Sequence, residues 1–86
     1  MKCIESFDEL KTICASTDGM FTDLFIQLNF GLRSSKRVFY NPETNTFDVH
    51  NEIDDSYQDD LTEEQLTNET HIIEALNLGA LYQYDI

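Results

Sequence analysis

The stretch Leu24-Phe25-Ile26-Gln27-Leu28-Asn29-Phe30-Gly31-Leu32 decides the fold class of this 86-residue chain. Every second residue from Leu24 to Leu32 is apolar, and a period of two predicts a β-strand with one buried face. Arg33-Ser34-Ser35 is interpreted as a turn, and residues 36–41 as a second strand. Turn chemistry around Pro42 follows, and the alternating residues 46–53 predict a third strand. The three strands are expected to form an antiparallel meander.

The segment before the predicted strands has the pattern of a helix, and the segment after them has the composition of a loop. Ser6 and Glu9 have the spacing of a capping box, and the apolar stripe that follows predicts a helix over residues 7–16. Residues 54–60 have no apolar period and hold four carboxylates. This composition predicts a surface loop between the last strand and the helices that follow.

The C-terminal third of the chain begins with a second capping box. Thr62 and Gln65 have its spacing, which predicts one or two helical turns over residues 63–67. Thr70 is expected to cap a third helix, and Gly79 to end it in the left-handed conformation that glycine takes readily. The tail then alternates apolar and polar residues, so a short C-terminal strand and a loose end both remain open.

These elements predict an α+β fold in the order α-β-β-β-α-α, a three-stranded antiparallel meander with helices on one face. The length leaves room for one small domain over residues 1–86. The apolar face beneath the helices should hold residues from the strands and from the first and third helices. They are Leu24, Ile26, Leu28, Phe30, Val38, Tyr40, Phe47, Val49 and Ile53 from the strands, and Leu10, Ile13, Ile73 and Leu76 from the helices.

The charge of the chain is distributed unevenly. The formal net charge is −12, yet residues 1–37 are neutral overall and residues 38–86 contain no Lys or Arg. A field of one sign repels nucleic acid and anionic membranes and attracts basic protein surfaces. Direct binding of nucleic acid would need a cationic footprint, and Arg33, Lys36 and Arg37 supply only a small one. A basic protein partner is therefore expected, with no direct nucleic-acid or membrane contact.

Sequence features of secretion and membrane insertion are missing. No apolar run reaches the length of a membrane span, and the start of the chain does not resemble a signal peptide. Cys3 and Cys14 cannot build a disulfide framework and are expected to be free thiols, with Cys14 in the core. The simplest expectation is a cytoplasmic protein.

The sequence offers little material for catalysis or for a cofactor. His50 and His71 are the only candidate bases for a nucleophile, and both are expected at the surface without an orienting partner. Two Cys and two His without close spacing do not form a zinc site, and the acidic segment does not match a calcium-binding loop. The three glycines are isolated and give no phosphate loop. We expect no catalytic residue, no metal and no cofactor.

Acidic residues follow one another from the third strand to the second predicted helix, and we call this set the acidic ridge. A solvated surface that keeps the protein soluble is one interpretation. The other is a binding surface, because a dense negative array resembles the phosphates of a nucleic acid and would fit a cationic groove. The ridge consists of Asp48, Glu52, Asp54, Asp55, Asp59, Asp60, Glu63 and Glu64.

A second candidate surface lies on the opposite side of the predicted sheet. Phe25, Arg37 and Phe39 point away from the helices in the predicted pattern, and we call them the aromatic patch. Exposed aromatic residues beside arginine are typical of protein contacts. Burial of the patch under the C-terminal tail is the alternative.

Three segments carry a resemblance to known proteins: residues 33–40 (RSSKRVFY), 51–56 (NEIDDS) and 78–82 (LGALY). Together they resemble small uncharacterised proteins encoded by bacteriophages, over about residues 24–82. In size and acidity the chain is also similar to anti-CRISPR and anti-restriction inhibitors. The resemblance implies a mobile-element protein in the cytoplasm of a bacterial host that acts by stoichiometric binding.

The combined expectation is a non-enzymatic inhibitor or adaptor. It would bind a basic host protein, such as a CRISPR effector or another nucleic-acid enzyme, through the acidic ridge, as a mimic of DNA. The alternative is a phage structural, assembly or adaptor protein that associates through the apolar sheet face or the edge of the C-terminal tail, including as a homodimer.

Overall fold

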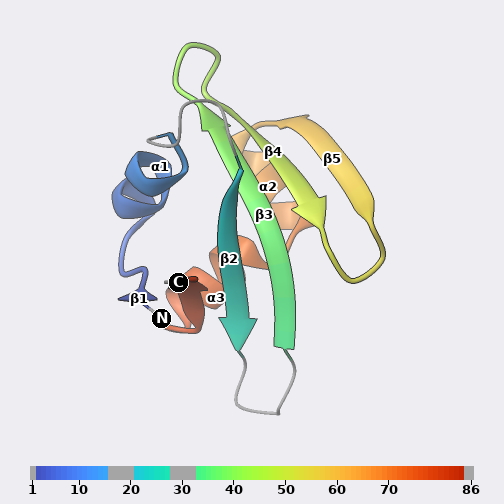
Figure 1. Cartoon of the computed structure of the whole chain (residues 1–86). Coiled ribbons are helices and arrows are strands. Elements are labelled where there is room, and N and C mark those ends of the chain that lie inside the picture. The colour runs from blue at the N-terminus through green and yellow to red at the C-terminus, as the bar shows by residue number, and fades with distance from the viewer. Residues whose placement is uncertain (1, 16–20, 28–32, 85–86) are drawn as a thin grey trace.

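Figure 1 shows the computed structural model of the chain, which describes residues 2–15, 21–27 and 33–84. The fold is of the α+β type. Within the described residues it contains β1 (Lys2–Cys3), α1 (Phe7–Ala15), β2 (Thr22–Gln27), β3 (Arg33–Asn41), β4 (Thr46–Asn51), β5 (Ser56–Leu61), α2 (Glu63–Glu69), α3 (Ile72–Asn77) and β6 (Leu81–Gln83).

One antiparallel sheet unites the six described strands in the order β1-β6-β2-β3-β4-β5. The prediction of a three-stranded meander in the order α-β-β-β-α-α is therefore wrong. The predicted strands form the centre of the sheet as β2, β3 and β4, and β5 is added beside β4 (Figure 1). On the other side, β6 pairs with β2, and β1 pairs with β6. The added strands are short or strongly polar, so their own sequences carry little alternating signal.

The predicted loop over residues 54–60 is mostly strand β5. Its partner is β4, with His50 opposite Tyr57, and a bulge interrupts the register before Leu61. At the bulge Asp60 has a φ of 56°, and its backbone N–H donates to Asp48 Oδ1 at 2.8 Å. An edge strand needs little apolar surface because it is only partly covered, which explains why its composition resembles that of a loop.

The third predicted strand ends earlier than expected, and Ile53 does not enter the core. β4 stops at Asn51, and the side chain of Ile53 is 74% exposed in the turn that joins β4 to β5. Asp54 Oδ1 accepts hydrogen bonds from Ser56 N–H at 3.1 Å and from Ser56 Oγ at 2.7 Å, and Asp55 has a φ of 56°. Local Asp and Ser hydrogen bonding thus overrides the alternating pattern.

The predicted turn at Arg33-Ser34-Ser35 is wrong, because β3 begins at Arg33. In the register with β2, Arg33 lies opposite Gln27 and Ser34 opposite Ile26. Pairing with a long neighbouring strand outweighs the weak turn preference of serine. The predicted first strand is described as Thr22–Gln27, while Leu28 and Phe30 lie outside the described residues.

The C-terminal tail contributes a strand to the interior of the sheet. β6 lies between β1 and β2, with Leu81 opposite Ile26 and Cys3 opposite Tyr82. Ile4 N–H donates to Leu81 O at 2.9 Å. Of the two alternatives left open by the sequence, the short strand is the one observed. Strand β1 has only two residues, too few for any periodic pattern to show.

Local sequence signals fix the helix ends. Ser6 Oγ accepts from Glu9 N–H at 3.1 Å, although the Glu9 carboxylate lies 3.6 Å from Lys2 Nζ rather than completing a capping box. The second capping box is complete, since Thr62 Oγ1 accepts from Gln65 N–H and Gln65 Oε1 accepts from Thr62 N–H. Helix α2 continues to Glu69, beyond the predicted end at residue 67.

The third helix starts one residue later than Thr70 capping predicts. His71 is the N-cap, without a side-chain cap bond, while Thr70 Oγ1 accepts from Ile72 N–H at 3.3 Å. Gly79 has a φ of 69°, and Ala80 N–H donates to Ala75 O at 2.8 Å. This arrangement closes the helix C-terminus as predicted and directs the chain into β6.

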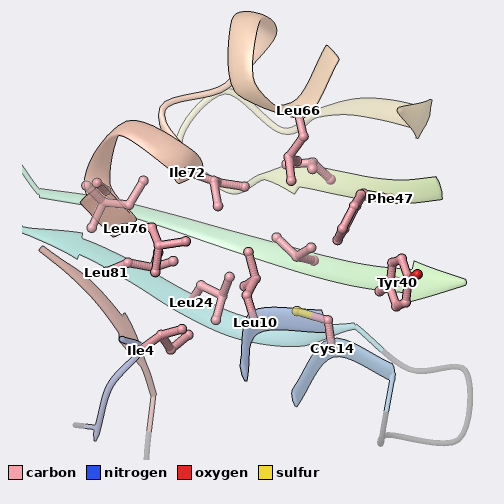
Figure 2. Packing of buried hydrophobic residues seen from close by; sticks show 14 of the residues in the cluster. Ile4, Leu10, Cys14, Leu24, Tyr40, Phe47, Leu66, Ile72, Leu76 and Leu81 are labelled. Atoms are coloured by element: carbon pink, nitrogen blue, oxygen red, sulfur yellow. The ribbon is translucent and has the colours of Figure 1, made fainter. Parts of the chain in front are cut away.

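Side chains from the three helices and from one face of the sheet meet in a single core (Figure 2). Of the predicted core residues, Leu10, Leu24, Ile26, Val38, Tyr40, Phe47, Val49 and Leu76 are buried, and Ile13 and Ile73 are half-buried. The prediction missed Ile4, Leu61, Leu66, Ile72, Ala75, Ala80 and Leu81. Most of the missed residues belong to the polar strand, the short strands and the two C-terminal helices.

Cys14 lies in this core, fully buried, and burial raises the pKa of its thiol to about 12, partly offset by a hydrogen bond with Thr22. Cys3 is partly exposed. At pH 8 we expect iodoacetamide to alkylate Cys3 and to spare Cys14, because a pKa raised this far leaves about a thousandfold less thiolate. Mass spectrometry of labelled peptides with and without urea measures the difference. Equal labelling of both thiols in the native protein would contradict the buried position of Cys14.

Candidate protein-binding surface

The described helices cover only one face of the sheet. Helices α2 and α3 lie behind the sheet in Figure 1. Helix α1 packs on the same side, since Lys11 Nζ lies 6.0 Å from the centre of the Tyr40 ring and Tyr40 belongs to the core. The strand residues that point the other way form a second face, which carries no helix of the described chain. We call it the open face.

Three residues of the acidic ridge are engaged by groups on the open face or beside it. Asp48 Oδ1 accepts the Asp60 backbone N–H at 2.8 Å. Glu52 Oε1 lies 2.8 Å from Arg37 Nε, and Asp55 Oδ1 lies 2.7 Å from His50 Nε2. These contacts hold the carboxylates in place, and the Arg37 contact partly neutralises the ridge.

The rest of the ridge has no counter-charge at ion-pair distance among the side chains that the structure describes. Within the described residues, no ion pair includes Asp59, Asp60, Glu63 or Glu64, which are all exposed. Asp59 and Asp60 lie near the end of β5, and Glu63 and Glu64 lie in the first turn of α2. Asp54 bonds to Ser56, and this bonding lowers the pKa of its carboxyl. The structure therefore groups most of the ridge along one edge of the sheet and the helix that follows.

The aromatic patch divides into one covered and two accessible residues. Phe25 is only 7% exposed because Tyr84 packs against it at 5.5 Å between ring centres, so the tail does cover this end. Phe39 is half-buried and meets Phe21 edge-on at 6.4 Å. Arg37 is exposed, with Nε 2.9 Å from Asp23 Oδ1. The hydrogen bond with Asp23, the charges of Asp23 and Glu52, and a bond to Glu52 raise the Arg37 pKa.

Sequence reasoning missed an aromatic pair on the same face. The rings of His50 and Tyr57 stack at 4.3 Å with an interplanar angle of 10°, and Tyr57 is 60% exposed. The sequence predicts His50 at the surface without a partner, yet its ring is mostly covered. Assigning residues 54–60 to a loop hides Tyr57, because only a strand register places it opposite His50.

On the covered side of the sheet, Asn51 organises a polar network beside the core. Its amide nitrogen donates to Ser56 Oγ and to Gln58 Oε1, each at 3.1 Å, while its oxygen accepts from Lys36 Nζ. Lys36 is buried, and burial lowers the pKa of its amine despite the nearby Asp54 carboxylate. The network fixes the base of the β4–β5 turn, and with it the positions of the ridge carboxylates there.

The remaining candidates for chemistry lie apart from one another. An open depression of about 710 Å³ lies between the β3–β4 turn and α2 and is lined by Thr44, Asn45, Thr62, Glu63, Glu64, Thr67 and Asn68. Among the residues that the structure describes, no three His, Cys, Asp or Glu side chains are grouped to hold a metal ion. His71 lies on the surface with Glu74, whose Oε2 is 3.3 Å from Nδ1.

Comparison with known proteins returned no matching family model, no matching curated sequence and no matching solved structure. Within residues 2–15, 21–27 and 33–84, none of the helices has the length and apolar character needed to cross a membrane.

Proposed function

We propose that this protein is a non-enzymatic inhibitor that binds a basic, nucleic-acid-binding host protein and keeps nucleic acid out of its binding groove. The acidic ridge is the contact surface. Its setting is the cytoplasm of a bacterial host, in keeping with the resemblance to small bacteriophage proteins and to anti-CRISPR and anti-restriction inhibitors. A CRISPR effector or another nucleic-acid enzyme is the type of partner that this surface fits.

The observation that carries the proposal is a group of four exposed carboxylates, Asp59, Asp60, Glu63 and Glu64, for which the described side chains provide no ion-pair partner. Residues 38–86 have no Lys or Arg, and the four acids lie close together in the sequence, two near the end of edge strand β5 and two in the first turn of α2. Unpaired negative charge costs a small fold self-repulsion, and a cationic groove offsets that cost on binding. The same array repels nucleic acid, so the complex excludes it.

A variant in which four ridge carboxylates are replaced by neutral amides tests this proposal, and we call it the charge-neutral ridge variant. The changes Asp59→Asn, Asp60→Asn, Glu63→Gln and Glu64→Gln remove four charges and keep the side-chain sizes, and Asn tolerates the positive φ of Asp60. Wild type and variant are used as bait in bacterial lysate at low salt and at about 0.5 M salt, which screens exposed charges. We expect wild type alone to capture nucleic-acid-binding proteins, to lose them at high salt, and to release them when DNA is added.

A second variant with the same net charge controls for solubility. Glu5→Gln, Asp8→Asn, Glu43→Gln and Glu69→Gln also remove four exposed charges, away from the stretch between Asp59 and Glu64. The control should capture the same proteins as wild type. Equal capture by all three proteins, or capture that DNA does not compete, would reject the ridge as the contact surface.

A further inference from the structure

We propose that the open face of the sheet binds an arginine-rich polypeptide segment of the partner. The residues that carry this inference are Asp23, Arg37, Phe39, Asp48, His50 and Tyr57. The inference rests on the proposed function and adds to it a second contact surface and a chemical preference for arginine over lysine.

The open face has a regular arrangement because four strands contribute one residue each to a single row. Asp23 lies opposite Arg37, Arg37 opposite His50, and His50 opposite Tyr57 in the registers of β2, β3, β4 and β5. Phe39, the next residue of β3 on this face, lies opposite Asp48. Acidic and aromatic side chains are therefore interspersed across the sheet at the spacing of neighbouring strands.

Apolar surface is concentrated on this side of the molecule. Phe21 packs on Phe39, Tyr84 packs on Phe25, and Tyr57 stacks on His50, and these contacts place all three on the open face. Their exposed fractions are 38%, 44% and 60%. The two other large exposed apolar residues of the described chain, Ile53 and Leu78, lie in the β4–β5 turn and at the end of α3. Exposed aromatic rings grouped on one face of a sheet are typical of a contact surface.

The charge of the open face indicates which kind of molecule binds there. Asp23, Asp48, Glu52 and Asp55 lie on it or bond to its residues, while Arg37 is its one Lys or Arg among the described side chains. Nucleic acid would be repelled. A second copy of this chain would bring the same negative face against itself, which like-charge repulsion opposes. A cationic polypeptide is the occupant whose charge complements the excess of carboxylates on this face and whose side chains can pack on the aromatic rings.

Arginine fits this face better than lysine for two reasons. A guanidinium stacks on aromatic rings and donates in a planar fork to carboxylates, whereas an ammonium is a compact, strongly hydrated charge. Arg37 of this chain already binds carboxylates in this way, since its Nε lies 2.9 Å from Asp23 Oδ1 and 2.8 Å from Glu52 Oε1. Asp55 contacts His50, whose ring stacks on Tyr57, and Phe39 lies opposite Asp48. A partner arginine would therefore meet a carboxylate and an aromatic ring at each of these two places.

Synthetic nona-arginine and nona-lysine peptides are the probes for the test. Affinity is measured at about 0.15 M salt by calorimetry, and the contact surface is mapped by amide chemical shifts of the ¹⁵N-labelled protein. We expect nona-arginine to bind more tightly than nona-lysine, by up to about two- to five-fold per stacked ring, which is the whole value of a cation–π contact at an exposed site. Shifts should concentrate on β3, β4 and β5 around Arg37, His50 and Tyr57.

Tyr57→Ser is the test variant, and Leu78→Ser is its matched control, since both side chains are largely exposed and lie on different parts of the surface. Tyr57→Ser should lower the affinity for nona-arginine more than that for nona-lysine, while Leu78→Ser changes neither. Equal affinity for the two peptides, or shifts confined to Asp59, Asp60, Glu63 and Glu64, would overturn the role of the open face and leave the ridge proposal standing. Loss of nona-arginine binding in the charge-neutral ridge variant, with binding unchanged in Tyr57→Ser, would also overturn the role of the open face.

Discussion

Replacing Leu81 by Asp is expected to unfold the protein. Leu81 is completely buried in β6, where it lies opposite Ile26, and its carbonyl accepts the Ile4 N–H. An unpaired carboxylate in this position loses its water without gaining a partner, which costs several kcal/mol even after relaxation. Stabilities of small domains are about 5–15 kcal/mol in total. The change therefore removes most or all of the free energy of unfolding.

Circular dichroism and urea unfolding measure this loss. Leu78→Asp adds the same charge at an exposed position of the neighbouring helix end and should cost no more than about 1 kcal/mol, mainly through the helix dipole. A Leu81→Asp protein with native spectra and a wild-type urea midpoint would mean that the C-terminal strand does not lie inside the sheet.

Phe47→Ala should produce the second large effect, a loss of about 3–5 kcal/mol in the free energy of unfolding. The Phe47 ring is fully buried and contacts Tyr40 at 4.7 Å and Phe7 at 5.8 Å between ring centres. Removing it leaves a cavity between helix α1 and the sheet, because neither neighbour can collapse into the space without breaking other contacts.

Phe39→Ala is the comparison that isolates burial from ring size. Phe39 lies on the same sheet but on the open face, half-buried against Phe21, so its removal should cost clearly less. Urea midpoints of the two variants provide the test. Equal losses would show that the open face is as well packed as the core, contrary to the distribution of buried residues.

Local signals predicted the centre of the fold, and long-range pairing decided the rest. The alternation near Leu24 and the capping box at Thr62 depend on residues close in sequence, and both led to elements that the structure contains. Strand β5 has one buried apolar residue, Leu61, so its identity depends on pairing with β4. Ile53 shows the opposite error, because turn hydrogen bonds at Asp54 ended a pattern that continued in the sequence.

For the candidate site, the sequence showed which side chains are charged but not which of them form pairs with other side chains. The pairs Glu52–Arg37 and Asp55–His50 join residues that only the sheet registers and the β4–β5 turn bring together. The same registers place Tyr57 beside His50. Consequently the ridge and the aromatic patch, which the sequence presents as two surfaces, meet along β3, β4 and β5.

The carboxylates on β5 have a further consequence for how the protein behaves at high concentration. An edge strand is a template for pairing with another molecule, and inward or flanking charges and bulges protect against such aggregation. Asp59, Asp60 and the bulge beside them supply that protection here. A second molecule that paired along this edge would bring its own carboxylates against Asp59 and Asp60 and would meet a strand whose register is interrupted. The acids that we assign to partner binding therefore also keep copies of this protein from joining edge to edge.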